Sequence, residues 1–171
     1  MASRHAIPAA PSALPAAIKA FRLAYPPRSG HQCSMLWILR FLFVAILGSM
    51  LAVTGWASGQ CALFAIPRDV FTHPWFIATL FDAYWAFVTF TVWVVWKEQS
   101  LGARILWFIA VILWGNIAMS LYMLVELFRI KTIDQLGEVF ATRRPGKLAF
   151  PAILTALGVV IYLLGAQSLF A

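Results

Sequence analysis

The stretch of positions 75–96 contains a single formally charged residue, Asp82. A helix rises roughly 1.5 Å per residue, so this stretch is long enough to cross the ~30 Å hydrocarbon core of a bilayer. A carboxylate at the centre of such a span costs about 2.5–3.5 kcal/mol and therefore needs a physical reason. The stretch predicts an integral membrane protein, and Asp82 is its first candidate for a functional residue.

The composition agrees with this prediction, because 63% of the residues are hydrophobic and 11% are charged. A soluble domain is about 45–50% apolar and about 25% charged. Charge-poor stretches predict four membrane helices, at about 36–57, 75–96, 104–128 and 149–170. We therefore expect an all-α fold, a four-transmembrane-helix bundle that forms one domain over residues 35–171 of a multi-pass membrane protein. The sequence does not indicate which membrane holds it.

Residues 1–34 differ from the rest because they are basic, rich in Ala and Pro, and free of acidic residues. Three interpretations are open: a tail on the membrane surface, a targeting extension, or an untranslated leader before a start at Met35. No packed domain is expected here. With four spans, both ends of the chain lie on one side, and the two sides carry nearly equal numbers of basic residues. A start at Met35 instead favours a cytoplasmic 129–147 loop.

The 129–147 loop contains a pattern typical of a short helix. Thr132 and Gln135 fit a capping box, and apolar residues recur at helical spacing after them. We expect an interfacial helix at about 132–142, with its basic end on lipid head groups or, alternatively, on a partner protein.

The net charge of +7 does not indicate a nucleic-acid-binding protein, because the basic residues lie in tails and connections and form no dense stripe. The expected partner is the lipid bilayer. A homo-oligomer or a larger membrane complex is also compatible with the sequence.

Polar residues gather on neighbouring faces of the second and third predicted helices. If those two helices run antiparallel, Asp82 and Glu126 lie toward the same membrane surface, with His73 in the loop at the mouth of a polar pocket. The predicted intramembrane polar site consists of Asp82, Glu126, Thr79, Tyr84, Asn116 and Tyr122.

Four interpretations of this pocket are open. Asp82 could hold helices together by bonding to Thr79, to a hydroxyl on the third helix or to a basic residue. It could titrate during proton or cation transport, with Glu126 as a relay. It could line a lipid or small-ligand site beside Tyr84 and Trp85. Lastly, His73, Asp82 and Glu126 are ligand types that bind a divalent metal, although their spacing fits no known pattern.

No motif indicates catalysis. The sequence has no Gly-rich phosphate loop, no nucleophile elbow and no paired metal-binding histidines. We therefore expect no enzyme activity and no cofactor.

Three motifs resemble those of a known family. A Pro-Trp pair is followed by Ala-Thr-Leu-Phe-Asp-Ala-Tyr, a Lys-Glu-Gln-Ser turn follows the same helix, and Trp114 begins a Trp-Gly-Asn segment that leads to Tyr122. Over about 35–129 the chain resembles small polytopic membrane proteins of plants and bacteria, a family of unknown function. The resemblance implies no activity. It implies that Pro74, Trp75, Thr79, Asp82, Tyr84, Lys97 and Glu98 occupy the family's motif positions.

The Lys97–Glu98 pair at the end of the second helix is typical of a solvated turn in which the lysine binds terminal carbonyls. The sequence as a whole predicts a small accessory or ligand- and lipid-binding membrane component. The alternative function is a proton- or cation-coupled transporter or channel that uses Asp82.

Overall fold

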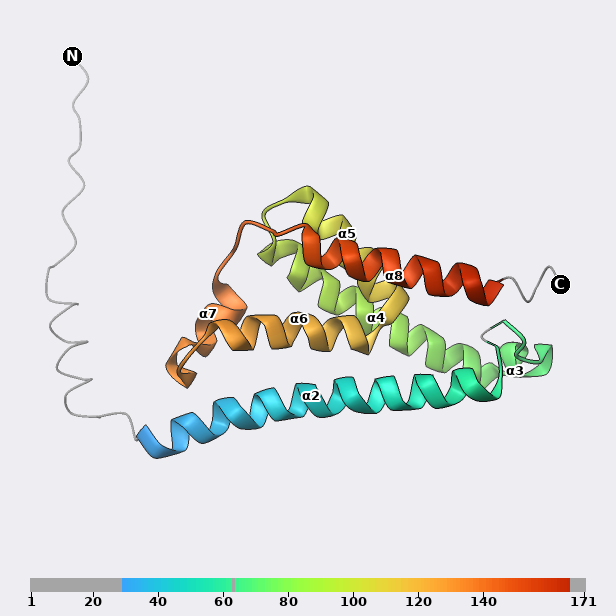
Figure 1. Ribbon diagram of the computed structural model, residues 1–171, viewed down its shortest axis with the longest axis horizontal. Helices are drawn as coiled ribbons and strands as arrows, with labels where there is room; N and C mark the ends of the chain where they lie inside the picture. Colours follow the sequence, from blue (N-terminus) through green and yellow to red (C-terminus); the bar gives the residue numbers. More distant parts are fainter. Residues whose placement is uncertain (1–28, 63, 167–171) are drawn as a thin grey trace, which may run out of the picture.

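The computed structural model describes residues 29–62 and 64–166, with side chains from Ser34 onward. The predictions for residues 1–28 lie outside this part of the chain. The described helices, shown in Figure 1, are α2 (Ser29–Gln60), α3 (Arg68–Thr72), α4 (Pro74–Lys97), α5 (Leu101–Trp114), α6 (Asn116–Arg129), the 3₁₀ helix η1 (Ile133–Gln135), α7 (Leu136–Ala141) and α8 (Ala149–Ala166).

The all-helical prediction is confirmed for the described residues. Three of the helices, within Ser34–Gln60, Pro74–Lys97 and Ala149–Ala166, are long and apolar enough to cross a membrane. They coincide with the stretches predicted at 36–57, 75–96 and 149–170, although residues 167–170 are outside the described part. Pro74 stands at the first position of α4, where its missing N–H leaves no hydrogen bond unmade.

The continuous helix predicted over 104–128 is wrong. Two helices of 14 residues, α5 and α6, occupy this stretch, and Gly115 separates them. Each is about 21 Å long, which is too short to cross the hydrocarbon core. Gly115 has φ 53° and ψ −127°, a conformation that side-chain-bearing residues avoid. A Cβ placed on Gly115 would also lie 2.7 Å from the ring of Phe87 on α4.

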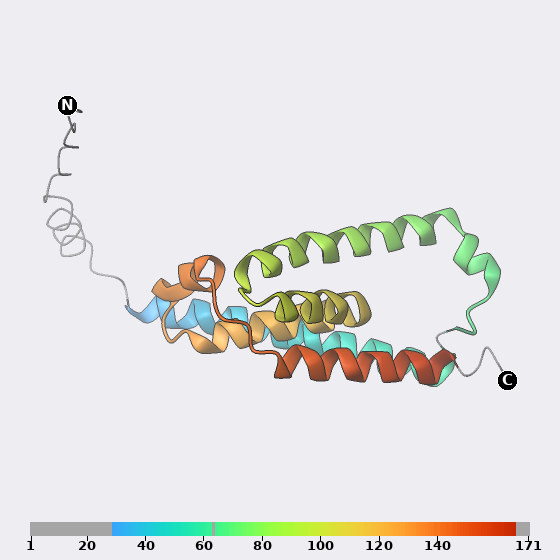
Figure 2. The same cartoon turned by 90° about the horizontal axis from the view of Figure 1, so that it is seen from above.

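The chain reverses direction at Gly115, so α5 and α6 form a hairpin that enters and leaves at the same end of the bundle. The Lys97 ammonium at the end of α4 contacts the Glu126 carboxylate near the end of α6. Figure 2 shows α2 beginning at this end and α8 ending at the other. The sequence predicts that both ends of the chain lie on one side, but the start of α2 and the end of α8 lie at opposite ends of the bundle. The reason is that the stretch predicted as the third span turns back at Gly115.

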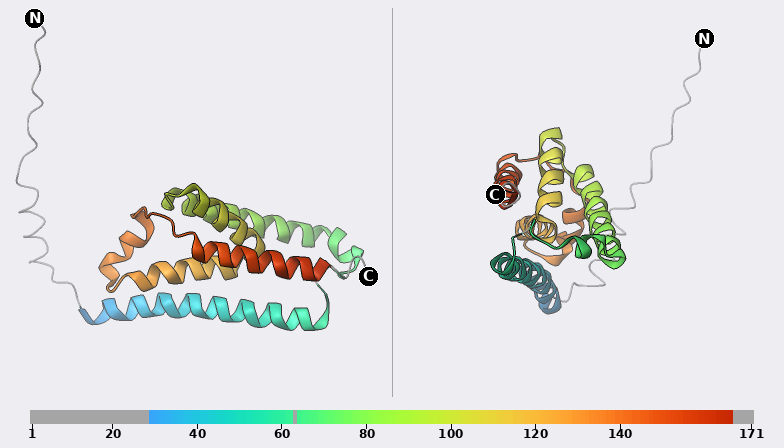
Figure 3. Two further views of the ribbon diagram at one scale, coloured as in Figure 1. Left: turned by 45° about the horizontal axis from the view of Figure 1, so that its top comes forward. Right: turned by 90° about the vertical axis from the view of Figure 1, so that its right-hand side faces the viewer.

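Helix α6 lies in the middle of the bundle, between α2 and α4 in the end-on view of Figure 3. Leu36 on α2 packs with Met123, Leu127 and Ile130 of the α6 region in one buried cluster. A second cluster joins α4, α5, α6 and α8. Because α6 is short, it covers only the first part of α2, and residues 51–60 are exposed.

Helix α8 packs closely on α5. The hydroxyls of Thr155 and Tyr162 donate to the backbone carbonyls of Leu106 and Leu113 at 3.0 and 3.2 Å. Gly158 lies between these hydroxyls on the same face, and a Cβ there would approach Trp114 to 2.8 Å. Hydroxyls and small residues at a helix contact are the features that allow close packing within a bilayer.

The segment after α6 returns to the same end of the bundle. The capping box of Thr132 and Gln135 is present at η1, and η1 and α7 lie within the stretch predicted at 132–142. An isolated parallel bridge then pairs Glu98 with Arg144. This bridge brings the connection that precedes α8 against the end of α4.

Candidate functional site

The candidate site is a buried ion cluster, which we define as Lys97, Glu98, Tyr122, Glu126, Arg129 and Arg144. At its centre, the Lys97 ammonium lies 2.5 Å from the Glu126 carboxylate, and the side chains are 0% and 2% exposed. The same ammonium donates to the backbone carbonyl of Val139 on α7 and lies over the ring of Trp93. The prediction of a solvated turn at Lys97 is therefore wrong.

Two arginines complete the surroundings of Glu126. Arg129 contacts one carboxylate oxygen at 2.5 Å, and Arg144 lies 3.6 Å from the other oxygen. These arginines are 36% and 27% exposed, so they connect the buried pair to the surface. Three cations therefore contact Glu126, of which only Lys97 is buried.

Glu98 has a different environment from Glu126. It is 7% exposed, and it accepts a hydrogen bond from the Tyr122 hydroxyl at 3.0 Å. Burial raises the pKa of the Glu98 carboxyl above its ordinary value, and the hydrogen bond from Tyr122 opposes this shift. Gly146 permits the arrangement, because a Cβ there would lie 2.7 Å from the carboxylate of Glu98 and 2.3 Å from Ala103.

Aromatic rings enclose Tyr122 on α6. Trp107 on α5 lies 4.8 Å from its ring centre, and Trp93 and Phe90 on α4 lie at 5.6 and 6.0 Å, all edge to face. Such contacts contribute about 0.5–1.5 kcal/mol each beyond the burial of their area. They hold the Tyr122 hydroxyl where it meets Glu98.

Arg40 on α2 reaches the same end of the bundle. Its guanidinium donates to the backbone carbonyls of Leu127 and Ile130 at 3.0 and 2.8 Å. The last carbonyls of a helix have no partner within it, and the macrodipole places negative charge there. Arg40 therefore supplies the cation that the end of α6 requires.

The ion cluster joins several elements of the bundle. The Lys97 ammonium is divided between Glu126 and the carbonyl of Val139, and the Glu126 carboxylate contacts three cations. The cluster therefore connects the end of α4 to α6, to α7 and to the connection before α8.

Sequence reasoning missed this cluster, because its pairs join residues that the predicted topology kept apart. With a continuous third helix, Lys97 and Glu126 belong to opposite membrane surfaces. The available signal was the Gly115-Asn116 pair in the middle of the predicted span, since Gly-Asn is typical of a turn.

The predicted polar site is brought together only in part. Tyr122 and Glu126 are in the ion cluster, whereas Asp82, Thr79, Tyr84 and Asn116 are exposed and outside it. Fifteen residues of α4 separate Asp82 from Lys97, the partner of Glu126, which is about 22 Å. The Thr79 hydroxyl donates to the Trp75 carbonyl of its own helix.

The three predicted metal ligands are also kept apart along α4. His73 precedes α4 at the end opposite Glu126. Among the described residues, no group of three His, Cys, Asp or Glu side chains is placed to hold a metal ion.

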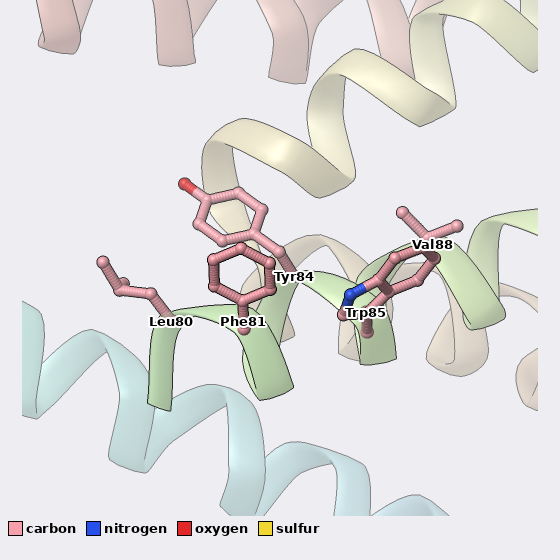
Figure 4. A pocket seen from close by; sticks show the side chains of 5 residues that line it. All are labelled: Leu80, Phe81, Tyr84, Trp85 and Val88. Carbon is pink, nitrogen blue, oxygen red and sulfur yellow. The ribbon is translucent and has the colours of Figure 1, made fainter. Parts of the chain in front are cut away.

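A shallow hollow of about 400 Å³ lies along α4, shown in Figure 4. It is lined by Leu80, Phe81, Tyr84, Trp85 and Val88. Tyr84 and Trp85 therefore do line a space together, as the ligand-site interpretation requires. Asp82 is not among its lining residues.

The comparison with protein families gives one match. DUF1475, described as a protein of unknown function, covers residues 9–144. The chain belongs to this family. The predicted resemblance to a family of unknown function is confirmed, and the match extends beyond the predicted 35–129 at both ends. It includes the ion cluster and the α5–α6 hairpin and stops before α8. No curated protein and no solved structure matches the chain.

Proposed function

We propose that this DUF1475 chain is a membrane accessory component that binds anionic phospholipid at one end of its bundle, and that it is not an enzyme. In this proposal α2, α4 and α8 cross the bilayer, and the α5–α6 hairpin enters it and returns. The three apolar helices of spanning length support the crossings. The fourth crossing of the original prediction is replaced by the hairpin, because neither of its helices is long enough.

The observation that carries the proposal is the distribution of positive charge. Among the described side chains, every Lys and Arg except Arg68 lies at the end of the bundle that holds the ion cluster. Arg68 belongs to α3, which precedes α4 at the other end. An excess of Lys and Arg marks the cytoplasmic side of membrane proteins. We therefore assign the ion cluster, α7 and the start of α2 to the cytoplasmic side.

The cations that can meet lipid head groups are the exposed ones. Lys131 and Lys147 are exposed at this end, and no ion pair or hydrogen bond of their side chains is found within the described residues. A basic residue near an anionic membrane surface contributes about 1 kcal/mol of attraction. These lysines are therefore suited to phospholipid head groups that carry a net negative charge.

The experiment compares nanodiscs of phosphatidylcholine with nanodiscs that also contain phosphatidylglycerol. We expect the anionic lipid to raise the unfolding temperature and to be retained by the protein in native mass spectrometry. A Lys131→Gln/Lys147→Gln variant should lose most of this preference, and Arg68→Gln, which lies at the other end, should keep it. Equal behaviour of the two lipids, or an equal loss in Arg68→Gln, contradicts the proposal.

The orientation has its own measurement. In a chain with the substitutions Cys33→Ser and Cys61→Ser, which remove the native thiols, a membrane-impermeant maleimide applied to intact cells should label Arg68→Cys and should label Lys131→Cys only after the cells are opened. The reverse pattern would contradict the cytoplasmic assignment of the basic end.

Proton- or cation-coupled transport is the second candidate, and a single observation favours it. Asp82 lies in the spanning stretch of α4, is exposed, and forms no ion pair or hydrogen bond within the described residues. The predicted relay is absent, since Glu126 is engaged at the other end of α4. An Asp82-dependent proton flux in proteoliposomes would support transport, and a flux unchanged in Asp82→Asn would exclude this use of Asp82.

A further inference from the structure

A groove lies between α2 and α4 with α6 as its floor, and we call it the α2–α4 groove. It has a volume of about 430 Å³ and is lined by Phe43, Phe90, Trp93, Met119, Met123 and Phe140. These side chains come from α2, α4, α6 and α7, so the groove is built by elements that are distant in sequence. Its lining is apolar, as a surface within a bilayer requires.

Two polar residues extend the walls of this groove toward the middle of the bundle. On α4, Asp82, Ala86, Thr89 and Trp93 follow one another at spacings of four, three and four, so they share a helix face. On α6, Asn116, Met119 and Met123 follow one another at spacings of three and four, so they also share a helix face. The face that begins at the apolar groove therefore continues to Asp82 and Asn116, which are both exposed.

The hollow beside Tyr84 is on the other flank of α4 and is a separate surface. Phe81, Tyr84 and Val88 line it at spacings of three and four. At these positions they lie on the side of α4 opposite the Asp82 face. Figure 4 shows its lining residues on neighbouring turns of the one helix. The α2–α4 groove is therefore the surface to which Asp82 belongs.

The charge of Asp82 indicates what covers this face. An exposed carboxylate eight residues into α4, about 12 Å from its start, requires a cation or a hydrogen-bond donor at the same depth. No described cation of this chain lies at that depth, because Arg68 lies before α4 and the other cations lie at the opposite end. A parallel second copy places the same described cations at the same two ends. Among the described residues, a cation at the depth of Asp82 therefore has no source in this chain, and a different protein is the source that the charge of Asp82 favours.

We infer that the α2–α4 groove docks a transmembrane helix of another protein, which presents a lysine or arginine opposite Asp82. Small residues beside the carboxylate, including Ala86, allow such a helix to approach closely. The rest of the docked helix would lie along the aromatic and methionine walls of the groove, which on α4 begin at Phe90, about 12 Å from Asp82. The inference goes beyond lipid binding, which concerns the exposed cations at the other end of α4.

The test uses a synthetic leucine-based transmembrane peptide with one lysine at the depth of Asp82 and an acceptor dye at its end. The full chain, with Cys33→Ser, receives a donor dye on the exposed Cys61 thiol and is placed in nanodiscs. We expect energy transfer with the lysine peptide and affinity at least about tenfold weaker for a matched glutamine peptide, a difference that an ion pair can produce. Asp82→Asn should remove the difference, and Asp69→Asn, outside the span, should retain it.

A steric pair of variants keeps the proposal testable if Asp82→Asn does not fold. Ala86→Trp blocks the Asp82 face and should prevent docking, whereas Val88→Trp lies on the opposite flank and should permit it. Equal binding of the lysine and glutamine peptides to the native chain would overturn the inference. Association of two labelled copies of the chain, seen as energy transfer between them, would also overturn the inference if it prevented the peptide from binding, because the occupant of the groove would then be a second copy. So would docking that survives Ala86→Trp. A native chain that shows no preference for phosphatidylglycerol would contradict the lipid proposal and leave this one standing.

Discussion

Replacing Glu126 by Gln removes the one carboxylate that, among the residues the structure describes, contacts the buried Lys97 ammonium. Because Lys97 and Glu126 are 0% and 2% exposed, neither side chain can turn to water when its partner is lost. Breaking a buried pair by removing one partner costs about 3–5 kcal/mol. The ion pairs of Arg129 and Arg144 contribute little to this value, because these arginines are 36% and 27% exposed and water screens their charge. We therefore expect Glu126→Gln to lower the free energy of unfolding by about 3–5 kcal/mol.

The measurement is reversible unfolding in detergent micelles, followed by tryptophan fluorescence, with five proteins compared: the native chain, Glu126→Gln, Lys97→Met, the double variant and a control. Glu138→Gln is the matched control, since Glu138 is exposed on α7. Lys97→Met/Glu126→Gln removes both buried charges, and it should recover much of the stability that Glu126→Gln loses. A Glu126→Gln value within about 0.5 kcal/mol of the native chain would refute the reasoning. A double variant whose loss equals the sum of the two single losses would refute it as well, because residues in contact are expected to couple.

Two other predictions concern the hairpin turn and the second buried carboxyl. Gly115→Ala should destabilise the protein by at least about 1–2 kcal/mol, which is the cost of a left-handed backbone at a residue with a side chain, and its Cβ would also meet the Phe87 ring at 2.7 Å. Gly137→Ala is the control, because a Cβ there meets open space. Equal melting temperatures of the two variants would contradict the turn conformation assigned to Gly115. The raised pKa of Glu98 predicts a contribution to stability that is present below its ordinary pKa of 4.5 and is lost as pH rises through the higher folded value. Glu98→Gln keeps an acceptor for the Tyr122 hydroxyl but cannot ionise. The melting temperature of this variant should therefore rise relative to that of the native chain as the pH increases above about 4.5. Parallel pH profiles of the two proteins would contradict the raised pKa of Glu98.

Much of the fold could be predicted because hydropathy is a local property. Each of the stretches that form α2, α4 and α8 contains an apolar segment of spanning length, and such a segment requires no knowledge of its neighbours. The short helix after α6 was also predictable, since the capping box of Thr132 and Gln135 lies within a few residues. The family resemblance depended on short contiguous motifs in the same way.

The candidate site could be predicted only in part, because its contacts depend on the topology. Tyr122 and Glu126 of the predicted polar site do have polar partners within the bundle. Their partners were assigned on α4 near Asp82, whereas the structure provides them at the other end of that helix. The error has a single source, since one reversal at Gly115 changes the depth of every residue in α6.

The sequence by itself predicted that this chain is helical, that four of its stretches are apolar enough to suit a bilayer, and that Asp82 needs an explanation there. The tertiary structure alone decided that the third of these stretches turns back at Gly115, that Lys97 is buried against Glu126, and that the cations gather at one end. The physical reason is the range of the interactions. Hydrophobic length and capping are set by neighbouring residues, whereas an ion pair between positions 97 and 126 exists only after the hairpin has brought two helix ends together.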